Sequence, residues 1–150
     1  MTEDDGASRC AGSCSGHEAA CVFRRPLLAR TAVCELAARH PLGEREVVVC
    51  RSAVARTNCS TLAALLHERA RFALKLPRPG RPLLHAQAMR LHCGGIVGLQ
   101  RALGAAVADV HELVATAHER HGSLTGLPWD QIVGTLAAWL PRRRSGPRAP

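Results

Sequence analysis

The sequence predicts a mainly α-helical protein, a single compact domain of four or five helices with at most one short strand pair near residues 46–50. Three observations predict this fold. The 150 residues fit one domain and little more. Hydrophobic residues make up 47% of the chain, which is enough for a core built mostly from Leu, Val and Ala, because Tyr is absent and Phe and Trp are rare. Apolar residues recur at helical spacing between Pro and Gly breaks.

Composition divides the chain into three parts. Residues 1–20 are rich in Gly, Ser, Ala and acidic side chains without an apolar period, so we expect a flexible arm that contains cysteines. Residues 21–140 are predicted to form a helical metal-binding domain. Residues 141–150 are basic and Pro-rich, which predicts a disordered tail.

The first helix is expected over residues 26–40, because Pro26 suits a first turn and Pro41 to Gly43 would end it. Residues 46–50 are β-branched and apolar, which fits a buried strand or an extended linker. A second helix is expected over residues 60–75, capped by Ser60 or Thr61. Its apolar positions are Leu62, Leu65, Leu66, Phe72 and Ala73.

The second half of the chain continues with helices. Residues 83–93 favour a helix by their Ala, Leu, Met and Gln content. A glycine pair, Gly94 and Gly95, is expected to separate them from a longer helix over residues 96–121, which Gly122 would end. A last amphipathic helix is predicted over residues 129–140.

Seven cysteines are the most informative feature of the composition. The acidic start of the chain does not resemble a secretory signal, and no run approaches the roughly 20 apolar residues of a membrane span. We therefore expect a cytoplasmic protein without membrane contact, whose thiols stay reduced. Burial as small hydrophobes would account for only some of the seven, which points to metal ligation.

The preferred ligand set is Cys34, Cys50, Cys59 and Cys93, holding an iron–sulfur cluster of the 4Fe–4S type, with zinc as the alternative metal. Cys59 precedes the expected helix cap at Ser60, and Cys93 precedes Gly94. A helix N-terminus stabilises a thiolate, which favours both residues as ligands. Cys34 is the weakest member because it lies on an apolar helix face, and Cys21 is its candidate substitute.

Two other ligand sets compete with this one. Cys10, Cys14, His17 and Cys21 lie within twelve residues and could close a tetrahedral zinc site in the arm. On a helix over residues 83–93, His85, His92 and Cys93 would share a side, although surface or capped histidines are the more common outcome. We expect His111 and His118 to lie at the surface.

The sequence thus predicts a small metal-centre protein acting in electron transfer, sensing or cluster handling. The alternative is a zinc-stabilised, nucleic-acid-binding regulator or a protein-interaction module. No catalytic motif is present, which favours a non-enzymatic role. The net charge of +8 favours an acidic protein partner or a larger redox enzyme. Nucleic acid is the alternative partner, but stacking aromatics are nearly absent. The sequence leaves the oligomeric state open.

Overall fold

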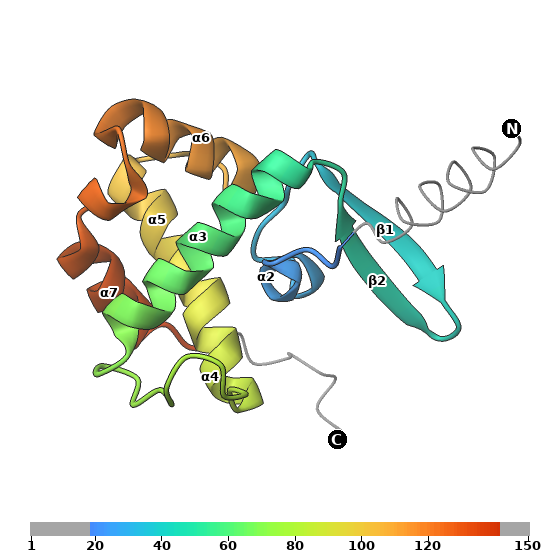
Figure 1. The fold of residues 1–150 in the computed structure, drawn as a ribbon, viewed down its shortest axis with the longest axis horizontal. Helices are drawn as coiled ribbons and strands as arrows, with labels where there is room; N and C mark the ends of the chain where they lie inside the picture. Colours follow the sequence, from blue (N-terminus) through green and yellow to red (C-terminus); the bar gives the residue numbers. More distant parts are fainter. Residues whose placement is uncertain (1–18, 142–150) are drawn as a thin grey trace, which may run out of the picture.

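Helices from the later two-thirds of the chain pack around one apolar core, and a β-hairpin from the first third projects away from them (Figure 1). The structure, a computed structural model, describes residues 19–141. The helices are α2 (Arg24–Leu28), α3 (Ala53–Ala70), α4 (His85–Met89), α5 (Gly95–Leu103), α6 (Val110–His121) and α7 (Trp129–Ala138), with a π-helical turn η1 (Arg90–Gly94) and a 3-10 turn η2 (Leu124–Gly126). The strands are β1 (Ala37–Leu42) and β2 (Arg45–Cys50). The predicted fold class, mainly helical with one strand pair, is confirmed.

The helix predicted over residues 26–40 is wrong. Helix α2 ends at Leu28, and Arg30 then adopts a left-handed conformation with φ of 59°. Residues 37–42 instead pair with β2 in an antiparallel hairpin, from Ala37 opposite Cys50 to Leu42 opposite Arg45. The β-branched run of β2 supplies a partner strand, and this pairing outweighs the helical preference of Ala and Leu. The segment 46–50 is therefore a strand rather than a linker.

Helix α3 begins seven residues earlier than predicted, because Ser52 caps it by accepting a hydrogen bond from the Ala55 backbone N–H at 3.1 Å. The expected apolar face is present at Leu62 and Leu66, which are both buried. The helix ends at Ala70, and Phe72 is 88% exposed rather than part of that face. Cys59 therefore lies in the second turn of the helix and not before its start.

Gly94 and Gly95 do not separate two helices. A helical stretch runs from His85 to Leu103, and η1 gives it a π-turn around Cys93. The glycines allow close packing: a Cβ on Gly94 would meet Trp139 Cβ at 2.9 Å, and one on Gly95 would meet Leu66 Cδ1 at 2.8 Å. The expectation that Cys93 stands at a helix N-terminus is consequently wrong.

The long helix predicted over residues 96–121 is two helices. Gly104, with φ of 65°, ends α5 in the left-handed conformation that glycine adopts without strain. Asp109 then caps α6 by accepting from the Glu112 backbone N–H at 3.1 Å. Gly122 ends α6 as predicted, with φ of 70°. The predicted helix over residues 129–140 corresponds to α7.

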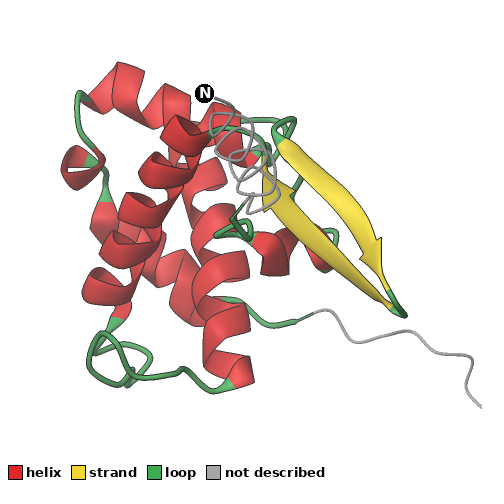
Figure 2. Cartoon of the chain, turned by 45° about the vertical axis from the view of Figure 1, so that its right-hand side comes forward, coloured by secondary structure: helices red, strands yellow, loops and turns green. Residues whose placement is uncertain are grey.

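The core lies between α3, η1, α5, α6 and α7, on one side of the hairpin (Figure 2). Its largest buried side chains include Leu62, Leu66, Leu91, Ile96, Leu99, Leu113, Ile132 and Leu136. Within residues 19–141 no helix is long and apolar enough to cross a membrane. The predicted arm and tail lie outside the described residues except for residues 19, 20 and 141, and Ala20 pairs with Val49 of β2.

Candidate metal centre

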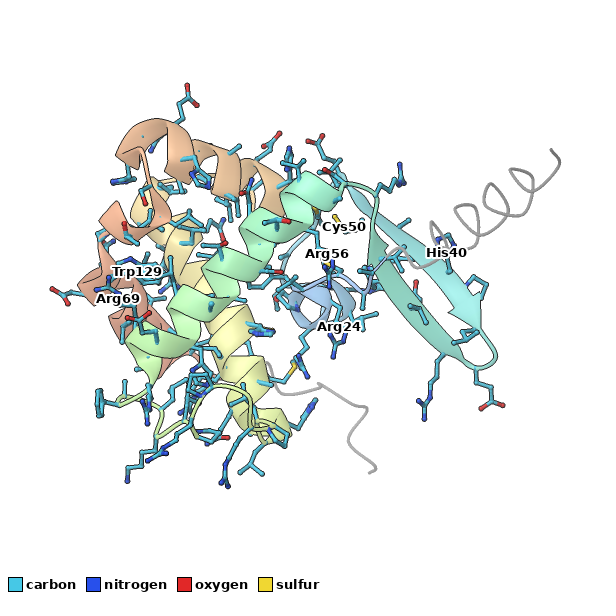
Figure 3. All side chains as sticks on the ribbon, in the orientation of Figure 1. Arg24, His40, Cys50, Arg56, Arg69 and Trp129 are labelled. Carbon is cyan, nitrogen blue, oxygen red and sulfur yellow. The ribbon has the colours of Figure 1, made fainter. Side chains whose placement is uncertain are left out.

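Four cysteines from four separate segments line one small cavity between α3, α6 and the hairpin. They are Cys21, Cys34, Cys50 and Cys59. The other residues around it are Val22, Leu36, Ala37, Ala55, Arg56, Val110 and His111. The cavity measures about 20 Å³, room for about one water molecule. Figure 3 shows Cys50 and Arg56 in the gap between α3 and the hairpin.

Strand β2 positions two of these cysteines. Cys50 is its last residue, and the segment before α2 runs antiparallel along its other edge. The Cys21 backbone N–H donates to Val48 O at 2.9 Å, and the Cys50 backbone N–H donates to Ala19 O at 3.3 Å. The Cys50 thiol donates to Ser52 O at 3.2 Å. The chain therefore holds Cys21 and Cys50 at the same end of one short sheet.

The other two cysteines come from the loop before β1 and from α3. The loop is held to the start of α6, because Val33 N donates to Ala108 O and Val110 N donates to Val33 O, both at 2.9 Å. This pairing brings Cys34 against Val110 and His111. The Ser52 cap starts α3 directly after β2, so that Ala55, Arg56 and Cys59 of its first two turns line the cavity.

Burial raises the pKa of three of these thiols and so favours their protonated form at neutral pH. Burial, with smaller contributions from the neighbouring Cys21, Cys34 and Cys50, raises the pKa of Cys59 to about 12. Burial also raises the pKa of Cys21 and of Cys34. The backbone N–H of Phe23 at Cys21, and those of Leu36 and His111 at Cys34, act in the opposite direction. Several thiolates could therefore coexist here only with a cation that neutralises them.

Arginine and histidine side chains border the cavity. Arg56 lines it, with Nε donating to Ala20 O at 3.5 Å. The charge of Arg24 favours the ionised form of Cys21, which offsets only a small part of the rise in pKa that burial causes. His111 lines the cavity, and its Nε2 lies 3.8 Å from Glu35 Oε1. A second hollow of about 210 Å³ borders Cys34 from another side, between Leu27, Val33, Ala37 and Arg39.

The fourth member of the predicted set, Cys93, does not line this cavity. It is fully buried in η1. Burial raises its pKa, while a hydrogen bond with Thr31 and the charge of Arg25 lower it. The structure thus brings Cys34, Cys50 and Cys59 together with Cys21, the substitute that the sequence suggested, and places Cys93 elsewhere.

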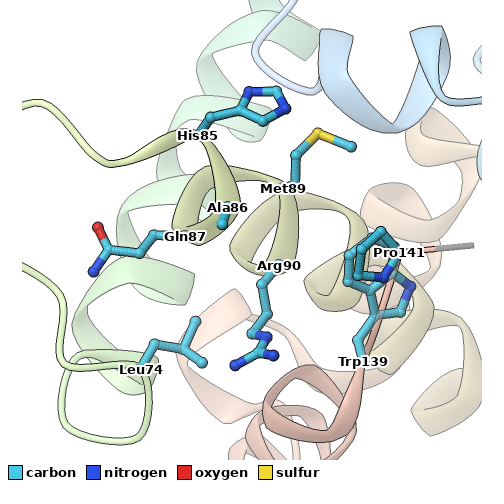
Figure 4. A pocket seen from close by; sticks show the side chains of 8 residues that line it. All are labelled: Leu74, His85, Ala86, Gln87, Met89, Arg90, Trp139 and Pro141. Carbon is cyan, nitrogen blue, oxygen red and sulfur yellow. The ribbon is translucent and has the colours of Figure 1, made fainter. Parts of the chain in front are cut away.

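The residues of the alternative ligand set, His85, His92 and Cys93, do not line a common cavity in the structure. His92 packs edge-on against Phe23 with ring centroids 5.5 Å apart, and its buried Nδ1 has no hydrogen-bond partner. His85 is exposed and lines a separate hollow of about 340 Å³ with Met89, Arg90 and Trp139 (Figure 4). Neither His92 nor Cys93 lines that hollow. His111, expected at the surface, is half-buried beside the cysteines.

All five described cysteines are free thiols, and Cys10, Cys14 and His17 of the predicted zinc set lie outside the described residues. Over residues 19–141, no three His, Cys, Asp or Glu side chains are grouped so that they could hold a metal ion. The thiols surround a cavity without meeting at one point. No family model, no curated protein and no solved structure matches the chain.

Proposed function

We propose that this protein is a small iron–sulfur protein whose 4Fe–4S cluster is held by Cys21, Cys34, Cys50 and Cys59. The observation that supports the proposal is the convergence of these four thiols on one cavity from four separate segments. Chance burial of small apolar side chains would scatter cysteines through the core, as it does for Cys93. The proposed ligand set replaces Cys93 of the sequence prediction by Cys21.

The spacing of the thiols favours a cluster over a single ion. Zinc needs four ligands at about 2.0–2.3 Å from one point. No such grouping exists within the described part of the chain. A cluster of four irons binds each thiolate to a different iron, so its ligands surround a larger body. The separation of the four cysteines along the chain suits a centre that joins several elements.

Cluster binding makes two demands on the site. The cavity is smaller than a cluster, so the thiols and the Arg56 side chain must turn outward. Small neighbours, Ala37 and Ala55, and the hollow behind Cys34 leave space for this. Iron must also displace the thiol protons, which makes binding more favourable as the pH rises.

Positive side chains and backbone N–H groups of the protein would offset the negative charge of a bound cluster. Four thiolates bring more negative charge than an oxidised cluster core neutralises, so the centre is anionic. Arg56 lines the cavity, and the charge of Arg24 acts on Cys21. Backbone N–H groups of Phe23, Leu36 and His111 interact with two of the sulfurs. Hydrogen bonds to sulfur and nearby charge set cluster potentials, so this surrounding suits electron transfer or redox sensing.

The test is to purify the full chain without oxygen, record its absorption spectrum, and quantify iron, sulfide and zinc. We expect a broad near-ultraviolet to visible band that bleaches with dithionite, with iron and sulfide both present. Serine variants of Cys21, Cys34, Cys50 and Cys59 should each lose most of the iron, at least fivefold. Cys93→Ala is the matched control, because it removes a buried thiol outside the cavity and should retain iron.

Three results would overturn the proposal. One is stoichiometric zinc without sulfide. The second is iron that persists in the Cys21→Ser and Cys59→Ser variants. The third is iron that disappears only in variants of Cys10, Cys14 and His17, which would move the centre into the arm.

A further inference from the structure

A hollow of about 760 Å³ lies between the end of α3 and the loop that follows it, and it shares no residue with the cysteine cavity. Ala63, Ala64 and Phe72 line it from the helix and its end, and Pro79 and Gly80 line it from the loop. Phe72 is 88% exposed, the largest fraction among the exposed large hydrophobic residues of residues 19–141. In Figure 1, α3 begins beside the hairpin and ends away from it, where this loop starts. An apolar hollow with an exposed aromatic side chain in its lining is typical of a surface that a partner covers.

Hydrogen bonds and burial hold both walls of this hollow in place. Where α3 ends, the Leu76 backbone N–H donates to Arg71 O at 2.9 Å, and Leu76 is 6% exposed and belongs to the core. In the loop, the Arg81 backbone N–H donates to Arg78 O at 3.2 Å and closes a turn. The third residue of this turn, Gly80, has φ of 91°, which glycine adopts without strain. A partner therefore meets a preformed surface, and little chain has to be ordered when it binds.

The charge at the hollow is positive. Arg71 and Glu68 both line it, and Glu68 is the only carboxylate in the lining. Arg78 and Arg81 are exposed, and they flank the two loop residues of the lining. Within residues 19–141 none of these four side chains forms an ion pair. Three arginines thus stand against one carboxylate, so an acidic partner is attracted to this surface.

The charged neighbours of the hollow do not reverse this balance. The Arg69 guanidinium lies over the Trp129 ring, 5.7 Å from its centroid, and Arg69 does not line the hollow. Asp130, which follows Trp129, does not line it either. Lys75 is exposed in the same loop and adds to the positive side.

We propose that this hollow binds an acidic amphipathic helix of a partner protein. We call it the Phe72 groove, lined by α3 and its end from Ala63 to Phe72 and by Pro79 and Gly80 of the loop. The apolar side chains of the bound helix cover the apolar lining, and its carboxylates face the arginines. The cysteine cavity takes no part in this docking, so the inference stands apart from the proposed cluster.

The length of the groove suits one face of a helix. From Ala63 to Phe72 the chain advances about 14 Å at the helical rise of 1.5 Å per residue. Apolar anchors at positions i, i+4 and i+7 of a bound helix span about 10 Å. Ala63 and Ala64 have small side chains, which leave room for such anchors. Helices that bind in grooves use this pattern of anchors.

The apolar lining distinguishes this groove from a surface for nucleic acid or lipid. A duplex gains its affinity from many phosphate contacts, more than three arginines supply. A single strand needs successive aromatic platforms, and Phe72 is the only Phe, Tyr or Trp in the lining. A bilayer takes up an apolar face that protrudes, whereas this one is hollowed. An acidic helix uses both the apolar lining and the positive charge.

The experiment uses a synthetic fluorescent peptide as the probe, an amphipathic helix with Leu at positions i, i+4 and i+7 and Glu over the remaining face. The full chain is titrated into it at low salt, and binding is followed by fluorescence anisotropy. A second peptide has Ser in place of each Leu, and a third has Lys in place of each Glu. The protein variants are Phe72→Ser, and Arg78→Glu with Arg81→Glu, all at exposed positions.

Matched controls change exposed residues elsewhere: Leu42→Ser in the hairpin, and Arg45→Glu with Arg101→Glu, which alters the net charge equally. We expect the Phe72 variant and the loop-arginine variant each to weaken binding about tenfold or more, and the controls less than about threefold, since a few contacts carry most of the affinity of an interface. Both altered peptides should bind at least about tenfold more weakly than the parent peptide. Circular dichroism on every variant checks that the fold is intact.

Absence of saturable binding below about 1 mM, or equal weakening by variants and controls, would overturn the proposal. Anionic vesicles or a duplex oligonucleotide that bind through Phe72 and the loop arginines, while the peptide does not, would also overturn it and assign the groove to lipid or to nucleic acid. The titration needs no iron. A chain without iron refutes the proposed cluster alone, and the peptide still decides on the groove.

Discussion

Residues 19–52 and residues 53–141 differ in how much of their apolar surface they bury. The later region, the helical bundle, buries large apolar side chains at helix contacts, and the described part of the chain contains no buried polar or charged residue. The earlier region has one five-residue helix and a hairpin whose outer half is exposed. Yet it supplies three of the four cavity cysteines. Most of the buried core therefore lies in the bundle, although Phe23, Leu27 and Val48 of the earlier region belong to it too. The candidate site lies where the two regions meet.

The largest expected effect tests where the stability resides. Leu66 is 1% exposed in the bundle, whereas Leu42 in the hairpin is 67% exposed. Leu66→Ala should lower the free energy of unfolding by about 3 kcal/mol, because it removes buried methyl groups and leaves a cavity. The same substitution at Leu42 should change it by less than about 0.5 kcal/mol. Urea unfolding followed by circular dichroism measures both; equal losses would end the distinction between the regions.

A largely but not fully buried histidine, His92, contacts both regions and should make the stability of the fold sensitive to acid. Burial, with the charges of Arg25 and Arg24, lowers the pKa of His92 from 6.5 to about 4. The unfolded chain therefore takes up a proton at a higher pH than the folded chain does. The contribution of neutral His92 is fully present above pH 6.5 and is lost as the pH falls toward 4, by about 2–3 kcal/mol.

This acid loss is measured by unfolding the wild type and two variants at several pH values. In His92→Gln, stability should vary less between pH 6.5 and 4, even though the variant is less stable at neutral pH. His121→Gln, which changes an exposed histidine, should leave the profile of the wild type unchanged. A wild-type profile that stays flat over this range would contradict the lowered pKa of His92.

Two glycines test the helix packing in the bundle. Replacement by Ala should lower the free energy of unfolding at one of them and raise it at the other. A Cβ on Gly98 would stand 2.9 Å from Ile132 O, so Gly98→Ala must push α5 and α7 apart, at a cost of about 1–2 kcal/mol. Gly134 in α7 has nothing within 4 Å, so Gly134→Ala should stabilise the helix by about 0.5–1 kcal/mol. Thermal unfolding compares them; stabilisation by both would refute the close contact of α5 and α7.

The smallest expected effect concerns the junction of the regions. Ser52→Ala removes the cap of α3 and should cost about 1 kcal/mol. Amide exchange should quicken in the first turn of α3, beside the cysteine cavity. Asp109→Ala removes the corresponding cap of α6 and should quicken exchange there instead. Exchange that changes throughout the chain in either variant would show that the two regions open as one unit.

The sequence alone determined the helical class, the apolar face of α3 at Leu62 and Leu66, the stop at Gly122 and the helix before Pro141. These follow from local spacing and turn chemistry, which act over a few residues. It also identified Cys34, Cys50 and Cys59 as candidate ligands, although partly for the wrong reason, because Cys59 does not precede a helix.

Only the tertiary structure decided the hairpin, the position of Cys21 rather than Cys93 at the cavity, and the role of the glycine pair. Residues 37–42 form a strand because β2 is available to pair with them, and this pairing carries Cys50 and Cys21 to the same end of a sheet. Gly94 and Gly95 allow close helix packing, because the Trp139 and Leu66 side chains lie where a Cβ on either residue would be. Such contacts join residues that are far apart in the chain, so a local sequence pattern does not specify them.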